Sequence, residues 1–414
     1  MGGSAAAGPE TPGPDAADRD PHRWWILALV SSAMLLSLSA WMTATAVGPE
    51  LQVRWDLSRS QVGLLTTTVQ LGFVLGTAIA AVLNLADVVP ARVLFAASAL
   101  LAALVNLTLL VVPDYVPALG ARLLTGVFLA GVYPPGMKMV ATWFRSGRGV
   151  AIGTAVGALT IGKALPYLLK AIGGAGLGVV VGGASAAGAL AAILVFFAYR
   201  DGPFAFPRRP FEWSRVGRIL RHRETMLATG GYLGHMWELY AMWTWVPAFL
   251  AVAAAGRVSS WAVDLVAFGT IAAGGLGCVW GGVAADRVGR DRVVNVAMAV
   301  SGICCVAAGL ALSAPFWLVS LLALVWGFFV VADSAQFSAM VTEVAPPDSV
   351  GTALMLQTSL GFLLTMVTIQ AVPLMVDAVD WRWAFAFLAL GPAAGITSIR
   401  RLVRVQRVHS TARP

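Results

Sequence analysis

Long runs of apolar residues dominate the chain, and each run is bounded by charged or turn-forming residues. Twelve runs are long enough to cross a bilayer, for which a helix needs about 20 apolar residues. They cover residues 24–47, 60–83, 91–112, 116–142, 149–169, 177–199, 225–252, 259–284, 292–312, 315–340, 350–375 and 383–403. The pattern therefore predicts an all-α membrane protein with twelve transmembrane helices.

The composition agrees with this prediction. Of the 414 residues, 58% are hydrophobic and only 12% are charged, whereas a soluble protein needs about 25% charged residues to cover its surface. A soluble enzyme is thereby excluded, and no motif brings a nucleophile, a base and an orienting group together. The three cysteines stand in apolar runs without metal-ligand or disulfide spacing, so we expect small core residues and no metal or cofactor.

The basic residues give the predicted bundle an orientation. Most of the 28 Lys and Arg residues lie at the termini, in the central loop, or in loops on the same side as these segments. The opposite side has Arg54, Arg59, Lys170, Arg257 and Arg382. The positive-inside rule then places both termini in the cytoplasm, in a cell (inner) membrane. The net charge of +8 is explained by this topology, so no nucleic-acid partner is needed.

One connection between the runs is long, and it divides the chain. We expect a disordered cytoplasmic tail over 1–23, six helices over 24–199, a cytoplasmic linker over 200–224, six helices over 225–403 and a cytoplasmic tail over 404–414. Within the linker, apolar residues recur at helical spacing among arginines between Phe211 and Arg223. This favours an amphipathic helix on the membrane surface, with a merely basic linker as the alternative.

The two halves repeat each other at a separation of about 200 residues. The matching positions are Pro49 and Pro247, Asp87 and Asp286, Gly126 and Gly327, and Gly149 and Gly351. Such a repeat predicts two pseudo-symmetric six-helix bundles with a substrate site between them near the midplane, a plan typical of secondary transporters.

The loop after the run 259–284 carries glycines and charges in a distinctive order, Asp286-Arg287-Val-Gly289-Arg290. Charged residues at helix ends interact with helix dipoles and can pair across the loop, so we expect a conformational latch there. The matching loop in the first half keeps Asp87 and Arg92 for the same role. Val88 and Pro90 replace the arginine and glycine, which weakens the first-half latch.

The run 116–142 contains Arg122, which precedes Gly126 by four residues, and then Tyr133-Pro134-Pro135. The prolines predict a break in the helix, and a broken helix within a membrane is tolerated where it faces a cavity or packed protein. Two roles remain open for Arg122. It can contribute to a substrate site, or its side chain can simply extend to the membrane surface.

The run Gly157–Ala164 is one residue short of a phosphate-binding loop, but it has Ala164 where magnesium needs a hydroxyl, and no strand precedes it. We expect no nucleotide partner. The glycines at 149, 153 and 157 instead indicate close helix packing.

Charges that remain inside the runs are the main candidates for function, because an isolated ion at the bilayer centre costs about 2.5–3.5 kcal/mol. His235 and Glu238 are three residues apart and share a helix face, which suits proton coupling. Trp237 and Tyr240, with Tyr232 and Trp243, can pack against a planar or apolar substrate. A structural ion pair is the alternative for Glu238.

Two further ionic residues lie at depth. Lys163 can hold a substrate anion or pair with an acid, and Asp333 lies in a polar stretch with Ser334 and Gln336. Lys138 and Asp264 lie closer to helix ends, where a capping or surface role is favoured. The runs contain three positive residues and three negative ones: Arg122, Lys138 and Lys163 against Glu238, Asp264 and Asp333. The net charge of the runs therefore does not predict whether the substrate is an anion or a cation.

The loop Asp286–Arg290 and the arginine–glycine spacing at Arg122 resemble two signatures of the major facilitator superfamily. The resemblance covers residues 24–403 and implies two six-helix bundles that expose a central cavity to each side in turn. It also implies that Arg122, Tyr133, Glu238, Tyr240 and Asp333 lie on the helices that line this cavity. Ala130-Gly131-Val-Tyr133-Pro134 resembles the organic-anion symporters of the superfamily.

We therefore expect a monomeric, proton-coupled symporter of a small organic solute, for example an organic anion. A proton-driven exporter of drugs or metabolites is the alternative, although Ala158 follows Gly157 where such exporters often have proline. A membrane receptor that does not transport is a remote third hypothesis.

Overall fold

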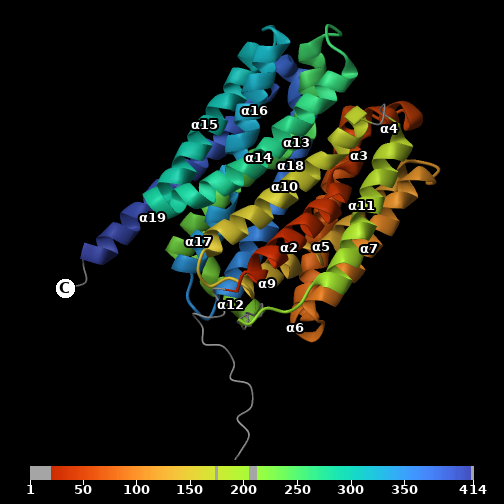
Figure 1. The fold of residues 1–414 in the computed structure, drawn as a ribbon. Helices are drawn as coiled ribbons and strands as arrows, with labels where there is room; N and C mark the ends of the chain where they lie inside the picture. The colour runs from red at the N-terminus through yellow and green to blue at the C-terminus, as the bar shows by residue number, and fades with distance from the viewer. Residues whose placement is uncertain (1–19, 173–175, 205–211, 412–414) are drawn as a thin grey trace, which may run out of the picture.

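The structure is a computed structural model that describes residues 20–172, 176–204 and 212–411. All regular elements in these residues are helices (Figure 1). Eleven helical segments are long and apolar enough to cross a membrane. A further helix, α13 (Arg223–Ala254), has 32 residues, or roughly 48 Å at 1.5 Å per residue, and lies inside the bundle. With it, the described chain has the twelve long helical segments expected from the sequence.

The first half of the chain contributes six of these segments. They are α2 (His22–Leu38) with η1 (Ser39–Trp41) and α3 (Thr43–Ala46); α5 (Arg59–Val82); α7 (Ala91–Leu107) with η2 (Thr108–Leu110); α8 (Tyr115–Leu129) with α9 (Tyr133–Ala141); α10 (Arg148–Ile172); and α11 (Leu177–Ala198). The short helices α4 (Gly48–Trp55) and α6 (Leu85–Val88) connect them.

The second half repeats the plan after the linker helix α12 (Trp213–Arg221). Its segments are α13; α14 (Ser260–Val288); α15 (Arg290–Ala311); α16 (Phe316–Ala332) with α17 (Ser334–Val344); α18 (Val350–Ala384); and η3 (Ala386–Ala389) with α19 (Leu390–Thr411). Because α19 continues to Thr411, residues 404–411 of the expected C-terminal tail are helical. Residues 1–19 of the expected N-terminal tail lie outside the described residues.

Both described ends of the chain and α12 lie at one end of the bundle, which we call the terminal end (Figure 1). The other end, which carries α4, is the opposite end. The helices α10 and α14, one from each half, pack against each other along their lengths. A Cβ atom at Gly157 would lie 2.7 Å from the carbonyl oxygen of Gly275. This contact confirms the expectation that the glycine repeat of α10 serves close helix packing.

Several spans are broken at mid-depth. The first changes from α2 to the 3₁₀ turn η1 at Ser39, the fourth breaks between α8 and α9, and the tenth breaks at Asp333 between α16 and α17. The break before Tyr133 was expected from Pro134 and Pro135. The fourth and tenth breaks are about 200 residues apart, so the structural repeat follows the sequence repeat.

The linker helix α12 binds to the second half of the chain. Its residue Ile219 is buried in an apolar cluster with side chains of α13, α15, α17, α18 and α19. Burial of one isoleucine contributes about 1.5–3 kcal/mol. The sequence predicted that the apolar face of this helix would lie on a membrane surface, but Ile219 contacts protein instead. The reason is that the ends of these five helices leave an apolar site under the linker.

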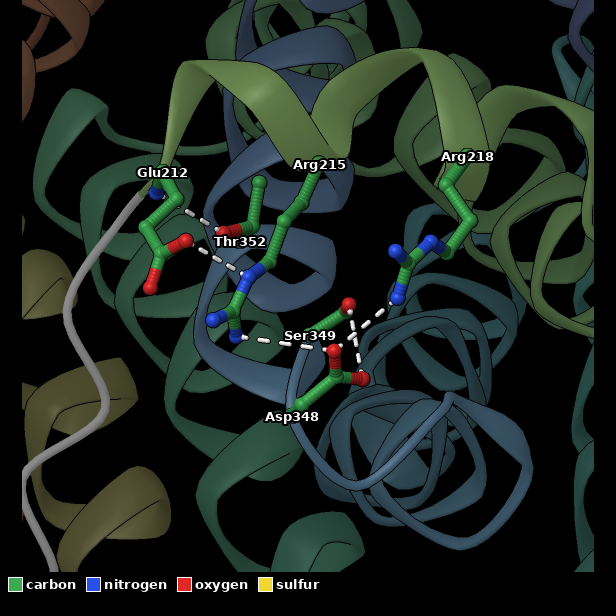
Figure 2. Close-up of polar contacts among 6 residues, drawn as sticks. All are labelled: Glu212, Arg215, Arg218, Asp348, Ser349 and Thr352. Atoms are coloured by element: carbon green, nitrogen blue, oxygen red, sulfur yellow. Dashed lines mark hydrogen bonds and ion pairs between the residues drawn. The ribbon is translucent and has the colours of Figure 1, made fainter.

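Polar contacts at the loop between α17 and α18 complete this docking (Figure 2). Arg218 Nη1 lies 2.9 Å from Asp348 Oδ2, and Arg215 Nη1 lies 3.9 Å from the same atom. The backbone N–H of Glu212 donates to Thr352 Oγ1 over 3.0 Å. The hydrogen bond from Ser349, together with the two guanidinium groups, holds the pKa of Asp348 below its ordinary value.

We predict that Asp348→Asn loosens α12. An exposed ion pair is weak, so we expect amide hydrogen exchange in α12 to rise roughly two- to fivefold. Because the pKa of Asp348 is lowered on folding, wild-type contacts are complete above about pH 4 and are lost only as the pH falls through that lowered pKa. The control Asp377→Asn, at the opposite end, should leave α12 unchanged. Equal exchange in all three proteins at pH 7 would contradict the prediction.

Candidate functional site

A cavity of about 620 Å³ lies between the two halves. Near the terminal end its lining residues Arg148, Thr342 and Glu343 are exposed. At its other extreme it is lined by Trp41, Phe73, Tyr240, Trp243 and Phe362, all of which are buried. The cavity therefore opens at the terminal end and is closed toward the opposite end.

Lys163 of α10 lies at the closed extreme of this cavity. Its Nζ atom lies 4.4 Å from the ring centroid of Trp41, 4.8 Å from that of Tyr240 and 5.2 Å from that of Trp243. It also donates a hydrogen bond to the Tyr240 hydroxyl. The ring faces attract the ammonium group, and each such contact contributes about 0.5–2 kcal/mol.

The aromatic residues around Lys163 also contact one another across the two halves. The Trp41 ring lies 5.9 Å from Tyr240 and 5.7 Å from Phe362, and Phe73 lies 4.8 Å from Phe362. We call these four residues, with Trp243, the aromatic ceiling. Among them, only Tyr240 and Trp243 were predicted from the sequence as candidate site residues. Trp41, Phe73 and Phe362 stand in apolar runs, where nothing distinguishes them from core residues.

His235 lines the cavity from α13 and pairs with Asp333 at the break of the tenth span. The distance from His235 Nδ1 to Asp333 Oδ1 is 2.9 Å, and Ser334 Oγ lies 2.8 Å from His235 Nε2. Both ring nitrogens thus have a polar partner, and both side chains are buried. The sequence named both residues but paired His235 with Glu238 instead.

Glu238 lies away from the cavity, on the side of α13 that faces α15 and α16. Its carboxylate accepts hydrogen bonds from Ser301 Oγ (2.9 Å), Cys305 Sγ (3.2 Å) and Trp326 Nε1 (2.5 Å). No described basic side chain forms an ion pair with it. The structure therefore does not bring Glu238 together with His235, although they are one turn apart.

The two predicted aromatic candidates beside Tyr240 have different positions. Tyr133 lines the cavity at the start of α9, where the fourth span resumes after its break. Trp237 points out of the cavity, and its Nε1 atom donates to the Phe387 carbonyl oxygen over 3.3 Å.

Arg122 is fully buried and lies outside the cavity. It donates to the carbonyl oxygens of Ala40 (3.0 Å) and Trp41 (2.5 Å), and to Asn106 Oδ1 (2.9 Å). The first two carbonyl groups belong to the break in the first span. Asn106 in turn donates to Ser185 of α11. Arg122 thus joins three helices and fixes the backbone that carries Trp41.

The predicted latch residues fall into two groups. Asp286 lies against the start of α10, since a Cβ atom at Gly149 would be 3.0 Å from its Oδ2 atom, and a carboxylate is favoured beside a helix N-terminus. Arg290 binds within the second half, with Nε 2.8 Å from Glu343 Oε1 and Nη1 2.8 Å from Gln336 Oε1.

The remaining latch positions contribute less to the site. Gly289 has a φ of +96°, which favours glycine, and Arg287 and Arg92 are exposed. The side chain of Asp87 lies outside the described residues.

Several contacts that join the two halves were not predicted. Arg59 pairs with Asp377 at 2.8 Å, and Lys170 Nζ lies 3.3 Å from Asp264 Oδ1. Thr365 donates to Gln70. Asp264, which the sequence assigned a capping or surface role, is thus one half of an ion pair between α14 and α10. Partners more than 90 residues apart cannot be found from local sequence spacing.

We predict that Arg122→Lys destabilises the protein. A lysine keeps the charge but cannot donate to three acceptors in the fixed geometry of the guanidinium group. Each buried acceptor left unpaired costs about 1–3 kcal/mol. The apparent melting temperature in detergent should fall by several degrees. The control Arg257→Lys also loses contacts to carbonyl oxygens, but at the surface end of α13. Equal melting of the two variants would contradict this role.

Comparisons with known proteins agree with this fold. The crystal structure of the nucleoside transporter NupG (D323A mutant) superposes with a TM-score of 0.69 at 13% identity, covering 91% of this chain and 99% of that one. A bacterial homologue of the human lysosomal transporter Spinster, inward-facing and occupied, gives 0.66 at 16% identity, covering 92% and 93%. No curated protein matches the chain in sequence.

The family comparison is decisive. The model of the Major Facilitator Superfamily matches residues 29–281 and 255–413, which is nearly the whole helical region. This match agrees with the signatures at Asp286–Arg290 and at Arg122, and with the broken spans around the cavity. The chain belongs to the Major Facilitator Superfamily and is a membrane transporter rather than an enzyme.

Proposed function

We propose that the protein carries a small organic anion across the membrane by proton-coupled symport. The observation that carries this proposal is the position of Lys163 and the lack of an acidic partner for it among the described residues. Its ammonium group reaches the closed extreme of the cavity, and no carboxylate among the described residues lies within the 4.0 Å of an ion pair. A buried lysine that has only aromatic rings and one hydroxyl for partners can, when protonated, donate charge-assisted hydrogen bonds to a substrate carboxylate or phosphate.

The other charges of the cavity support an anionic cargo. Arg148, Lys163, His235 and Arg290 line it, and Glu343 is the only acidic residue among the described lining residues. Glu343 is already paired with Arg290. Asp333, behind the wall, is paired with His235. The described charged groups of the cavity that have no partner of opposite charge are therefore positive, which favours an anionic ligand.

The pair His235–Asp333 is the proposed proton site. It touches the cavity through His235, and it lies at a helix break, where a change of charge can alter the backbone between α16 and α17. Histidine is the side chain whose ordinary pKa permits protonation near neutral pH. Glu238 is the second candidate, since it is buried without a basic partner, but a proton would reach it only through the packed interior of the second half.

The terminal end is proposed to face the cytoplasm, because the basic residues are concentrated there. In that orientation the cavity opens to the cytoplasm and the aromatic ceiling closes it from outside. The protein is proposed to act as a monomer in the cell (inner) membrane. A proton-driven exporter is the alternative direction of the same cycle.

We test the cargo with four anions and their neutral counterparts: benzoate and benzamide, phenylacetate and phenylacetamide, succinate and succinamide, and uridine monophosphate and uridine. At least one anion should raise the melting temperature of the purified protein and bind tenfold or more tightly than its neutral partner. Lys163→Gln should remove that preference, while Arg59→Gln, a change of charge at the opposite end, should keep it. Binding of no anion above its neutral partner would refute the anionic cargo.

Proton coupling is tested in proteoliposomes with the anion that binds best. Asp333→Asn and His235→Gln should still permit exchange of the anion between the two sides but reduce pH-driven accumulation about tenfold or more. Glu238→Gln should retain it. Loss of accumulation in Glu238→Gln alone would move the proton site to Glu238. Accumulation that depends on an outward rather than inward proton gradient would identify an exporter.

A further inference from the structure

Lys163 connects the two halves of the protein through its side chain. It stands on α10 of the first half, whereas Tyr240 and Trp243, two of the three rings around it, stand on α13 of the second half. Its hydrogen bond to the Tyr240 hydroxyl crosses the same interface. The bond joins the fifth and seventh spans beside the contact between Trp41 and Tyr240.

The surroundings of the ammonium group leave it incompletely satisfied. An ammonium has three N–H donors, and the described residues offer it one oxygen acceptor, the Tyr240 hydroxyl. The rings of Trp41 and Trp243 replace part of its lost hydration. A carboxylate or phosphate at the same place would offer it several oxygen acceptors and a full opposite charge, whereas the Tyr240 hydroxyl offers one uncharged acceptor.

The aromatic ceiling depends on contacts that cross the interface. Trp41 and Phe73 of the first half contact Tyr240 and Phe362 of the second. Tyr240 contacts both Lys163 and the other rings of the ceiling. Its ring lies 5.4 Å from that of Phe362 and 5.1 Å from that of Trp243. A change in what Lys163 binds therefore reaches the ceiling directly through Tyr240.

From these contacts we infer that Lys163 is a releasable pin of the ceiling: an anion in the cavity draws the ammonium group away from Tyr240 and so favours opening toward the opposite end. This inference rests on the proposed anionic cargo and adds a mechanism to it. Neutral analogues that fit the cavity leave the pin in place. Selectivity for charge then arises at the opening step as well as at binding.

The test measures opening directly with spin labels at the opposite end. Val116→Cys at the start of α8 and Ser260→Cys at the start of α14 provide one exposed site on each half. The native cysteines Cys278, Cys304 and Cys305 are buried, so labelling is directed to the introduced sites. Pulsed dipolar spectroscopy then gives the fraction of molecules in which the two sites have moved apart.

Tyr240→Phe removes the acceptor and keeps the ring. The matched control is Tyr167→Phe, since Tyr167 is also on a buried helix face, one turn from Lys163, and its hydroxyl has no hydrogen-bond partner among the described residues. The bond has an ammonium donor, so its loss corresponds to roughly a ten- to hundredfold change in the ratio of open to closed molecules. We expect the open population of Tyr240→Phe to rise by that factor without any anion, and that of Tyr167→Phe to equal the wild type.

The anion that binds best in the panel above should raise the open population of the wild type, and its neutral partner should not. In Tyr240→Phe the anion should still bind, as judged by thermal shift, but should add less opening. If the anion binds the wild type and the labels do not move, or if Tyr240→Phe and Tyr167→Phe give equal open populations, the pin is refuted while the anionic cargo stands. If no anion binds the wild type, the proposal of an anionic cargo is refuted. The thermal-shift measurement shows this before any spin-label distance is measured.

Discussion

A backbone group that loses its helical partner inside a bilayer has to be satisfied by the protein itself, because lipid offers neither donors nor acceptors. This constraint governs the first span, where η1 interrupts α2 and exposes the carbonyl oxygens of Ala40 and Trp41. The guanidinium group of Arg122 satisfies both. The position of Trp41, and with it the closed extreme of the cavity, depends on this one interaction. The arginine of a family signature thus has a clear physical task.

The same constraint explains where the ionic residues of the interior are found. Arg122 binds a broken backbone, Asp333 stands at a break and pairs with His235, and Lys170 pairs with Asp264 between the halves. Glu238 accepts three hydrogen bonds. Among these buried charges of the described chain, Lys163 is the cation whose single hydrogen-bond partner is an uncharged hydroxyl. A group left in that condition is the natural place for a ligand of opposite charge.

Much of the fold follows from the sequence, since the length of an apolar run decides whether it spans a membrane. The spans, the break at Pro134 and Pro135, and the repeat of about 200 residues were predicted correctly. The candidate site was predicted in part. Lys163, His235, Asp333, Tyr133 and Tyr240 line the cavity or lie directly behind its wall.

Glu238 shows why the rest could not be predicted. Residues three apart on a helix differ by about 60° in direction, and in a crowded bundle that is enough for one side chain to face a cavity and the other a neighbouring helix. Which neighbours stand there is decided by tertiary packing. The ceiling residues Trp41, Phe73 and Phe362 were missed for the same reason, because an aromatic side chain in an apolar run looks the same whether it packs in a core or closes a gate.

The contact between Gly157 and Gly275 has a mechanical consequence. Where two helices meet backbone to backbone at glycines, few interlocking side chains need to change rotamer when one helix tilts against the other. The α10–α14 seam is therefore suited to act as a fulcrum: it stays in contact while the aromatic ceiling on one side and the cavity mouth on the other open and close around it.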